Sequence, residues 1–534
     1  MEFGLLNTGI VASYIIFTLI TGFVLGKKIT TDQHFYLGNK TTPWWAIGLS
    51  VVATYFGALT FLGGPAWAYQ EGLSVILIHI NYPIVVFIVA SVFLPFFYNS
   101  GVASIYDYLE SRFGKSTRLL MAGVFLFGNL AYSGIMLYTT ALVLEFIIGI
   151  DVTTAILVVA TIAMAYTILG GMSAVIWTDV AQSFLLLIGI IVIIVLLITE
   201  LPDGLFGTLS QLKASGKTSP YNFSFEPDKV ATIWTGVIAM TIYHVVVYGV
   251  NQMMVQRTLA AQNIGDAKKA YYLMGYSAFF IFMLFFTCGI LLNGYYADRA
   301  FENGNTIMLQ FASDAAIPGL MGVITAAVIA ASMSSLDSSL NSMATVTTLD
   351  FYKLLLKPDE SPSHYLKFTR LATLGWGIII IIPAILFIDS SGSVLEILSK
   401  IGSFLVGAKL SCYVLGFYSK HTTEKGLLVG VAAGFLSLWY ADSFLSIAWP
   451  WYCAIGGGVS LLVGWLASLC ISGRQTEHHP FSIVGQRINF EITGRDVKES
   501  GWYVLPGKVD KGSYGLLVFF VASLLMLFFI EFSI

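Results

Sequence analysis

Long apolar runs separated by short polar segments make up most of this chain of 534 residues. Most runs have about 20 residues, the length that crosses a bilayer as a helix, and they lack the period-two alternation of transmembrane strands. Because a backbone in lipid must satisfy its own hydrogen bonds, the pattern predicts an all-α polytopic membrane protein with about 14 transmembrane helices. The predicted spans are approximately 6–25, 44–69, 74–98, 119–147, 153–169, 178–199, 231–253, 272–294, 317–348, 370–387, 394–418, 426–441, 450–471 and 515–534.

Composition supports a lipid environment. Only 11% of the residues are charged and 57% are hydrophobic, whereas a soluble globular protein carries about 25% charged residues. The net charge is −3 and no basic cluster suggests a nucleic-acid partner. The four cysteines lie in apolar runs without close spacing, which argues against disulfides and zinc. The first run lacks a basic leader and a clear cleavage site, so we expect a retained helix.

The distribution of Lys and Arg predicts the orientation. If the chain starts outside and alternates, 21 of the 27 basic residues, Arg257 among them, lie in inside loops and 4 lie in outside loops, as the positive-inside rule requires. We therefore expect a multi-pass protein of the plasma or inner membrane with both termini outside. The largest loops are about 200–230 outside and 472–514 inside, and the second is predicted as a surface segment. Neither is long enough for a water-soluble domain, so the prediction is a single transmembrane domain over 1–534.

Two of the runs are interrupted. The span 44–69 carries Gly57 and a Gly63-Gly64-Pro65 cluster, and the span 231–253 carries Tyr248-Gly-Val-Asn-Gln252. Transporters often place their sites at broken helices near the membrane midplane. The two interrupted spans lie five apart, as two inverted five-helix repeats would need. Glycine also serves close helix packing, so this pattern alone leaves both interpretations open.

The span 317–348 is dense in side-chain oxygens. Hard cations prefer oxygen ligands, so two turns of hydroxyls with a carboxylate fit a sodium site. Serines bonded to the backbone of their own helix are the alternative, but an unpaired carboxylate there costs roughly 2.5–3.5 kcal/mol or more. The polar residues of these turns are Ser334, Ser335, Asp337, Ser338 and Asn341.

Asp179, Asp337 and Lys409 are ionisable residues inside predicted spans, and none has a partner nearby in sequence. Such residues mark functional sites by default. A structural Asp–Lys pair between helices is the alternative for Lys409. Two aspartates also suggest an intramembrane aspartyl protease, but the contexts Thr178-Asp179 and Leu336-Asp337 differ from the Tyr-Asp and Gly-x-Gly-Asp that this enzyme class needs.

Four stretches together resemble the sodium/solute symporter family, which includes the sodium/glucose cotransporters. The resemblance covers about residues 30–425. It implies a ten-helix inverted-repeat (5+5) core of the leucine-transporter type over about 44–418, a leading helix at 6–25 and extra helices over about 426–534. The stretches are Gly170–Asp179 (Gly-Gly…Thr-Asp), Asn251–Arg257 (Asn-Gln-x-x-Val-Gln-Arg), Ser334–Tyr352 and Tyr106–Phe113.

The resemblance implies a main sodium site and a second one. A second sodium near the inner end of the core would use Asp179, Asp337 and Ser338 together with Ser334. Asp337 departs from the family pattern, which has a small residue there, and its carboxylate would either strengthen the site or bind a proton. The main site would consist of the backbone carbonyls of Ala53, Phe56 and Ala331 and the hydroxyls of Ser334 and Ser335.

Matching the solute pocket of the family gives Thr60, His79, Tyr132 and Asn251. The sugar carriers have Gln at the position of Thr60 and Glu at that of His79, and the sialic-acid carriers have Arg where this chain has Tyr132, so neither specificity transfers. His79 and Lys409 would suit a carboxylate-bearing solute if they faced the pocket. A hydrogen-bonded core histidine is the alternative for His79.

The expected function is a sodium-coupled symporter that imports a small organic solute, a sugar or an organic acid, by alternating access. We expect Na+ as the cofactor, the lipid bilayer as the environment, a functional monomer and no enzymatic activity. A sodium-independent uniporter and a transporter-like sensor remain alternatives.

Overall fold

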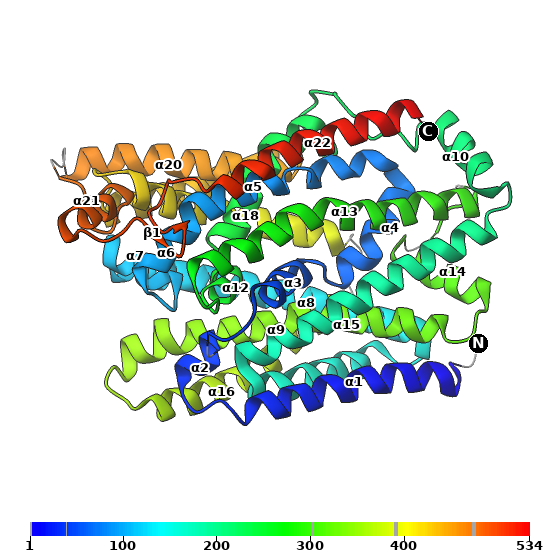
Figure 1. Cartoon of the computed structure of the whole chain (residues 1–534), viewed down its shortest axis with the longest axis horizontal. Helices are drawn as coiled ribbons and strands as arrows, with labels where there is room; N and C mark the ends of the chain where they lie inside the picture. The colour runs from blue at the N-terminus through cyan, green and yellow to red at the C-terminus, as the bar shows by residue number, and fades with distance from the viewer. Residues whose placement is uncertain are drawn as a thin grey trace.

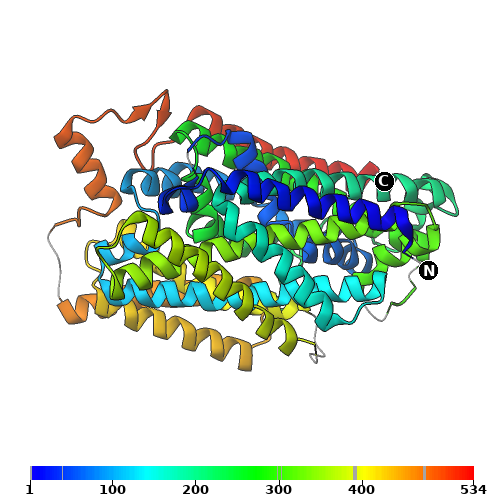
Figure 2. The ribbon, with the colours of Figure 1, turned by 90° about the horizontal axis from the view of Figure 1, so that it is seen from below.

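The computed structural model describes residues 3–38, 40–297, 299–301, 304–388, 394–472 and 477–533. Long helices run side by side along the long axis of the molecule (Figure 1). Both termini lie at one end of this axis, and the segment with α21 (Ile483–Thr493) lies at the other end in both views (Figures 1 and 2).

Helices of membrane length alternate with short helical pieces. Two short strands, β1 (Lys498–Glu499) and β2 (Trp502–Tyr503), form one antiparallel pair. The other elements are α1 (Gly4–Gly26), α2 (Asp32–Leu37), α3 (Trp44–Tyr55), α4 (Ala58–Glu71), η1 (Leu73–His79), α5 (Tyr82–Ile88), η2 (Val89–Phe93), α6 (Leu94–Ser100), α7 (Ile105–Arg112), α8 (Lys115–Ile148), α9 (Val152–Glu200), α10 (Gly204–Ala214), η3 (Thr235–Ala239), α11 (Met240–Gly249), α12 (Gln252–Thr258), α13 (Ile264–Tyr296), η4 (Gly304–Thr306), α14 (Ile307–Ala315), α15 (Leu320–Val346), η5 (Thr347–Leu356), α16 (Pro362–Ile379), α17 (Ile381–Leu386), α18 (Val394–Tyr418), α19 (Glu424–Phe444), α20 (Pro450–Ser472) and α22 (Lys511–Ser533).

The predicted membrane protein built from helices is confirmed, but the helices divide differently from the fourteen predicted spans. Among the described residues, 11 helices are long and apolar enough to cross a bilayer, and a twelfth span forms if Thr235–Gly249 and Gln252–Thr258 count as one. These two pieces meet at an angle of 56°, where the sequence predicted an interruption. The predicted span 44–69 is split into α3 and α4, so neither piece has the length of a full span.

Helix α9 joins two predicted spans, 153–169 and 178–199. It has 49 residues, but Gly171 leaves the helical conformation with φ 50° and ψ −154°. This φ lies in the left-handed region that favours glycine, and an added Cβ would lie 2.9 Å from the carbonyl oxygen of Phe35. The bend therefore divides α9 into two legs that correspond to the two predicted spans.

Helix α15 forms the centre of the bundle. It packs against α9, α8 and α1 and against both pieces of the broken span, α3 and α4. All its residues from Ile324 to Val346 are buried, including every serine. A buried helix that carries this many hydroxyls needs polar partners on its neighbours.

The segment 477–510, predicted as an inner surface segment, has a structure of its own. It contains α21 and the β1–β2 pair, so the chain is not purely helical. An ion pair of 2.5 Å joins Asp510 to Lys268 at the start of α13. The backbone N–H of Gly507 donates to the Ser91 carbonyl at 2.8 Å. These contacts hold the segment against the end of the bundle opposite the termini.

Candidate functional site

The break between α3 and α4 removes backbone carbonyls from the helical hydrogen-bond pattern. A regular helix bonds each N–H to the carbonyl four residues earlier. Here Phe56 (φ −90°, ψ 54°) and Gly57 (φ −72°, ψ −178°) leave that conformation. The N–H of Thr60 bonds to the Gly57 carbonyl, three residues earlier, at 2.9 Å, and the N–H of Phe56 is shared between the carbonyls of Ala53 at 3.1 Å and Val52 at 3.3 Å. The predicted break is therefore present in the middle of the span.

The hydroxyl of Ser335 meets this break. It donates to the Thr54 carbonyl at 3.1 Å and accepts from the Tyr132 hydroxyl at 3.4 Å. A Cβ at Gly57 would lie 2.7 Å from Ser335 Oγ, so the glycine is what allows the hydroxyl to approach the backbone. Ser335 is wholly buried. This contact places α15 directly against the carbonyls that the break frees.

Ser334 points to Asp179 on α9. Its hydroxyl donates to Asp179 Oδ1 at 2.5 Å, and the Ser50 hydroxyl on α3 donates to Oδ2 at 2.5 Å. Arg257 on α12 forms an ion pair with Oδ2 at 3.4 Å and donates from Nε to Ser50 Oγ at 2.8 Å. All four side chains are wholly buried. The carboxylate of Asp179 thus connects α3, α9, α12 and α15.

Asp337 lies beside this group but has only neutral partners among the described residues. It accepts from the Tyr166 hydroxyl at 2.8 Å, from Thr178 at 3.4 Å and from Ser338 at 3.0 Å. The guanidinium of Arg257 reaches Ser338 rather than Asp337. With both carboxylates ionised, two negative charges face one positive charge. A buried charge without compensation is costly, so the oxygen-rich cluster suits an additional cation.

An aromatic stack connects the break with His79. The ring of Phe56 lies 4.8 Å from that of Phe282, centroid to centroid. The His79 imidazole stacks on the same Phe282 ring at 3.5 Å, with an interplanar angle of 14°. His79 is half-buried, and the hydroxyl of Tyr82 lies 3.4 Å from its Nδ1. His79 is therefore two side chains away from the backbone of the break.

The other predicted solute residues are more dispersed. Tyr132 touches Ser335, and Thr60 lies in the first turn of α4, where it is half-buried. The side chain of Asn251 accepts from the N–H of Met253 at 3.0 Å and so caps the start of α12. Lys409 is 7% exposed, and its ammonium lies 5.5 Å from the ring centroid of Phe125. Among the described residues it forms no ion pair, which argues against a structural Asp–Lys pair with Asp179 or Asp337.

Sequence reasoning missed several members of the cluster. The positive-inside rule places Arg257 in an inside loop, but it is wholly buried and forms an ion pair with Asp179. Ser50, Tyr166 and Thr178 were not selected, because single hydroxyls in apolar runs carry no distinctive pattern. Arg257 ends the motif Asn251–Arg257, and a base so close to a helix break was the signal that could have identified it.

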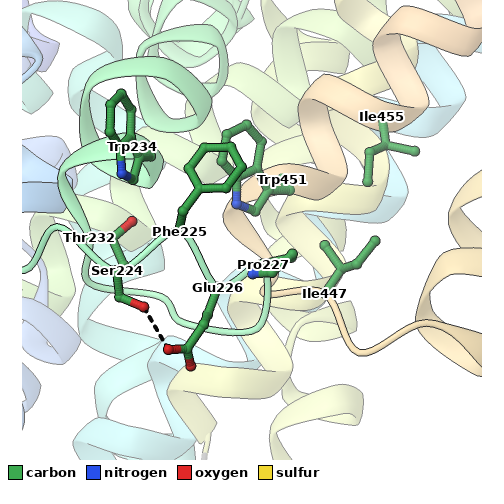
Figure 3. A pocket seen from close by; sticks show the side chains of 9 residues that line it. All are labelled: Ser224, Phe225, Glu226, Pro227, Thr232, Trp234, Ile447, Trp451 and Ile455. Carbon is green, nitrogen blue, oxygen red and sulfur yellow. Dashed lines mark hydrogen bonds between the residues drawn. The ribbon is translucent and has the colours of Figure 1, made fainter.

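A cavity of about 240 Å³ lies elsewhere, where the loop before η3 packs against α20. Three aromatic rings, those of Phe225, Trp234 and Trp451, gather around it, and Ser224 donates to Glu226 at its edge (Figure 3). No residue predicted for sodium or solute lines it, so we treat it as separate from the site. The lining residues are Ser224, Phe225, Glu226, Pro227, Thr232, Trp234, Ile447, Trp451 and Ile455.

Known proteins have a similar sequence and architecture. A substrate-bound, outward-open structure of a Na+-coupled sialic acid symporter, described as having a novel Na+ site, superposes with a TM-score of 0.81. It has 26% identity and covers 88% of this chain and 99% of its own. Sodium-coupled monocarboxylate transporter 2 of Bos taurus is 28% identical over 78% of this chain and 68% of its own length. The sodium/glucose cotransporter of Vibrio parahaemolyticus is 30% identical over 76% of this chain and 79% of its own length.

The model of the sodium:solute symporter family matches residues 35–434, most of the chain. The match contains the broken span, the acidic cluster and the serine-rich helix described above. These relatives are transporters and not enzymes, which disfavours the protease interpretation of the two aspartates. The chain therefore belongs to the sodium:solute symporter family and is a sodium-coupled transporter of a solute.

Proposed function

We propose that the main sodium ion binds between the α3–α4 break and α15. The proposed ligands are the carbonyls of Ala53, Phe56 and Ala331 and the hydroxyls of Ser334 and Ser335. One observation carries this proposal: the Ser335 hydroxyl on α15 donates at 3.1 Å to the carbonyl of Thr54, in the last turn of α3 before the break. Oxygen ligands alone suit a hard cation. A small rotation of the hydroxyl would turn its lone pairs, instead of its proton, toward an ion.

This position explains how sodium would control the conformation. An ion held by both α15 and the broken span fixes the angle between them, so its release would let the two move apart. Coupled import by alternating access requires that sodium and solute favour the same state, and each then raises the affinity for the other by an equal factor. Each sodium that enters contributes free energy to solute uptake. This free energy comes from the sodium concentration gradient and from the membrane potential, which adds about 2.3 kcal/mol per 100 mV.

A second sodium is proposed at Asp179, Ser334, Asp337 and Ser338. The supporting observation is the charge balance of the cluster, in which Arg257 pairs with Asp179 and leaves Asp337 with hydroxyl partners. A cation between the two carboxylates would remove their mutual repulsion. The side-chain oxygens needed for such an ion are already gathered there.

The proposed solute is a small organic molecule, a sugar or an organic acid. Its binding space would adjoin the break, with His79 on one side and Tyr132 on the other, and with Thr60 and Asn251 at its ends. The ring contacts of Phe282 with His79 and with Phe56 support this location, because they connect the proposed solute residue His79 to the proposed sodium ligand Phe56. Lys409 lies apart, near Phe125, and is proposed to meet a carboxylate-bearing solute on its inward path.

The finer architecture is also a proposal. If α9 counts as two spans and each broken helix as one, the chain crosses the membrane fourteen times. The position of both termini at one end of the molecule supports an even number (Figure 1). We propose a 5+5 inverted-repeat core at about 44–418, a leading helix at 6–25 and extra helices over about 426–534, in one domain over 1–534. We further propose a monomer in the cell membrane with both termini outside.

The test is a thermal-shift screen of the purified full-length protein with candidate solutes, in sodium and in potassium. Linkage predicts that a true solute raises the melting temperature more when sodium is present. A solute that stabilises the protein equally in both salts would favour a sodium-independent uniporter and contradict the proposal.

A further inference from the structure

His244 lies next to the proposed solute space, and the Asn81 side chain holds its Nδ1. The two nitrogen hydrogens of Asn81 donate to the carbonyls of Ile78 and Gly236, at 2.9 and 3.0 Å. The amide oxygen of Asn81 therefore faces the other way, toward His244 Nδ1 at 2.7 Å. The reversed amide would place its oxygen against two carbonyl oxygens, which no hydrogen could bridge.

This arrangement fixes the tautomer of His244. An amide oxygen only accepts, so the hydrogen of the contact must sit on Nδ1 of the imidazole. No carboxylate oxygen among the described residues forms an ion pair within 4.0 Å of either ring nitrogen, and an imidazolium inside a span would therefore lack a counter-charge. The neutral ring consequently has a bare Nε2, which can only accept a hydrogen bond.

The ring is held in place and is close to the site. Tyr82 stacks on it at 4.7 Å and Tyr243 meets it edge-on at 5.4 Å, centroid to centroid. The His79 imidazole lies 6.2 Å away. His244 keeps an exposed fraction of 5%, and no described residue hydrogen-bonds to its Nε2, which is not sealed from open space. A fixed, unpartnered acceptor thus lies beside the residues proposed to bind the solute.

We infer that His244 is a solute-binding residue whose Nδ1 is protonated because it donates to Asn81. Its Nε2 accepts a hydrogen bond from a hydroxyl or N–H group of the transported solute. The inference rests on the proposed solute space and narrows the solute class. Hydroxylated acids, sugars and amides qualify, whereas simple carboxylates and inorganic anions do not. A solute without a hydrogen-bond donor would remove water from Nε2 without replacing its hydrogen bond, which costs binding free energy.

The tautomer is tested by NMR of the full-length protein with ¹⁵N-labelled histidine. The chain has 7 histidines, and the signals lost in His244→Gln identify those of His244. We expect a protonated Nδ1 and a bare Nε2 in the wild type, and a mixture of tautomers in Asn81→Leu. A wild-type His244 that carries its proton on Nε2 would overturn the inference without reference to any solute.

The solute class is tested by thermal shift in sodium with L-lactate, D-glucose, N-acetylneuraminate, propionate and iodide. We expect stabilisation by one or more of the first three, which carry hydroxyl donors, and none by propionate or iodide. Stabilisation by propionate or iodide overturns the inference. So does the absence of stabilisation by all five in a protein that sodium alone stabilises. If sodium alone has no effect, the proposed sodium sites fail instead.

Two substitutions separate the roles of the two ring nitrogens. His244→Asn keeps an amide N–H near the position of Nδ1, so the contact with Asn81 remains, but it lacks an acceptor at Nε2. We expect about a tenfold weaker apparent affinity for the stabilising probe, the usual effect of one lost hydrogen bond, with unchanged sodium affinity. His244→Gln places an amide oxygen near Nε2 and should recover part of the loss.

His478→Asn, at an exposed loop position, is the control. Equal probe affinity in His244→Asn and the control would overturn the inference.

Discussion

Arg257 and Asp179 form an ion pair of 3.4 Å in the buried centre of the protein, although 78 residues separate them in the chain. Ser50 bridges the pair, because it accepts from Arg257 Nε and donates to Asp179 Oδ2. Arg257 belongs to the helix after the second break, and Ser50 belongs to the helix before the first one. The ion pair therefore ties the two broken spans to each other through α9.

Removing the base of this pair should destabilise the protein. In Arg257→Met the carboxylate of Asp179 loses its counter-charge, and breaking a buried pair typically costs about 3–5 kcal/mol. We expect a large fall in melting temperature. The double variant Arg257→Met/Asp179→Asn should recover much of the loss, because it leaves no unpaired charge. A double variant less stable than Arg257→Met would contradict an electrostatic role.

Ser335→Ala should weaken sodium binding at the main site. The substitution removes the hydroxyl that meets the break, and hydrogen bonds or ligands to a charged group are worth about 1.5–3 kcal/mol. The sodium concentration for half-maximal uptake should therefore rise roughly 10- to 100-fold. Ser339→Ala is the control, since Ser339 is one turn away on the same helix and its side-chain hydrogen bonds to described residues are weak, 3.4 Å to Asn129 and 3.8 Å to Met253. An unchanged sodium dependence in Ser335→Ala would remove Ser335 from the site.

Asp337→Asn should abolish the second sodium site without loss of folding. Its partners Tyr166, Thr178 and Ser338 are neutral, so an amide leaves no charge unpaired. We expect the Hill coefficient for sodium to fall towards one while uptake continues through the main site. Measured sodium-to-solute stoichiometry checks this directly, with Asp314→Asn at an exposed position as the control. If the stoichiometry stays the same, Asp337 has a structural role.

Phe282→Leu should loosen the coupling between sodium and solute. The ring of Phe282 contacts both the Phe56 ring and the His79 imidazole, and a smaller aliphatic side chain removes both ring contacts. We expect sodium to bind with near-normal affinity alone, while its enhancement of solute affinity falls several-fold, and the reverse enhancement must fall by the same factor. Isothermal titration of each ligand with and without the other measures both. Phe280→Leu, with its ring 48% exposed on the other side of α13, should leave both enhancements intact.

Much of the site was predictable from individual residues. The breaks at Phe56–Gly57 and at residues 248–252 follow from glycines and polar groups inside apolar runs, and both are present. The family assignment follows from the motifs around Asp179, Asn251 and Ser334 and is confirmed by the match over 35–434. The positive-inside rule, however, places Arg257 in an inside loop, because counting basic residues does not reveal a buried acidic partner far along the chain.

The sequence by itself determined that the chain lies in lipid, that it is helical, and which polar and ionisable residues stand inside apolar spans. It could do so because hydrophobicity and helix propensity are properties of short segments. Only the tertiary structure decided which of those residues meet. The pairing of Asp179 with Arg257, the approach of Ser335 to Thr54 and the orientation of the Asn81 amide toward His244 each join distant segments. Their physical cause is the packing of helices around α15, where buried polar groups find partners on other helices that no local pattern specifies.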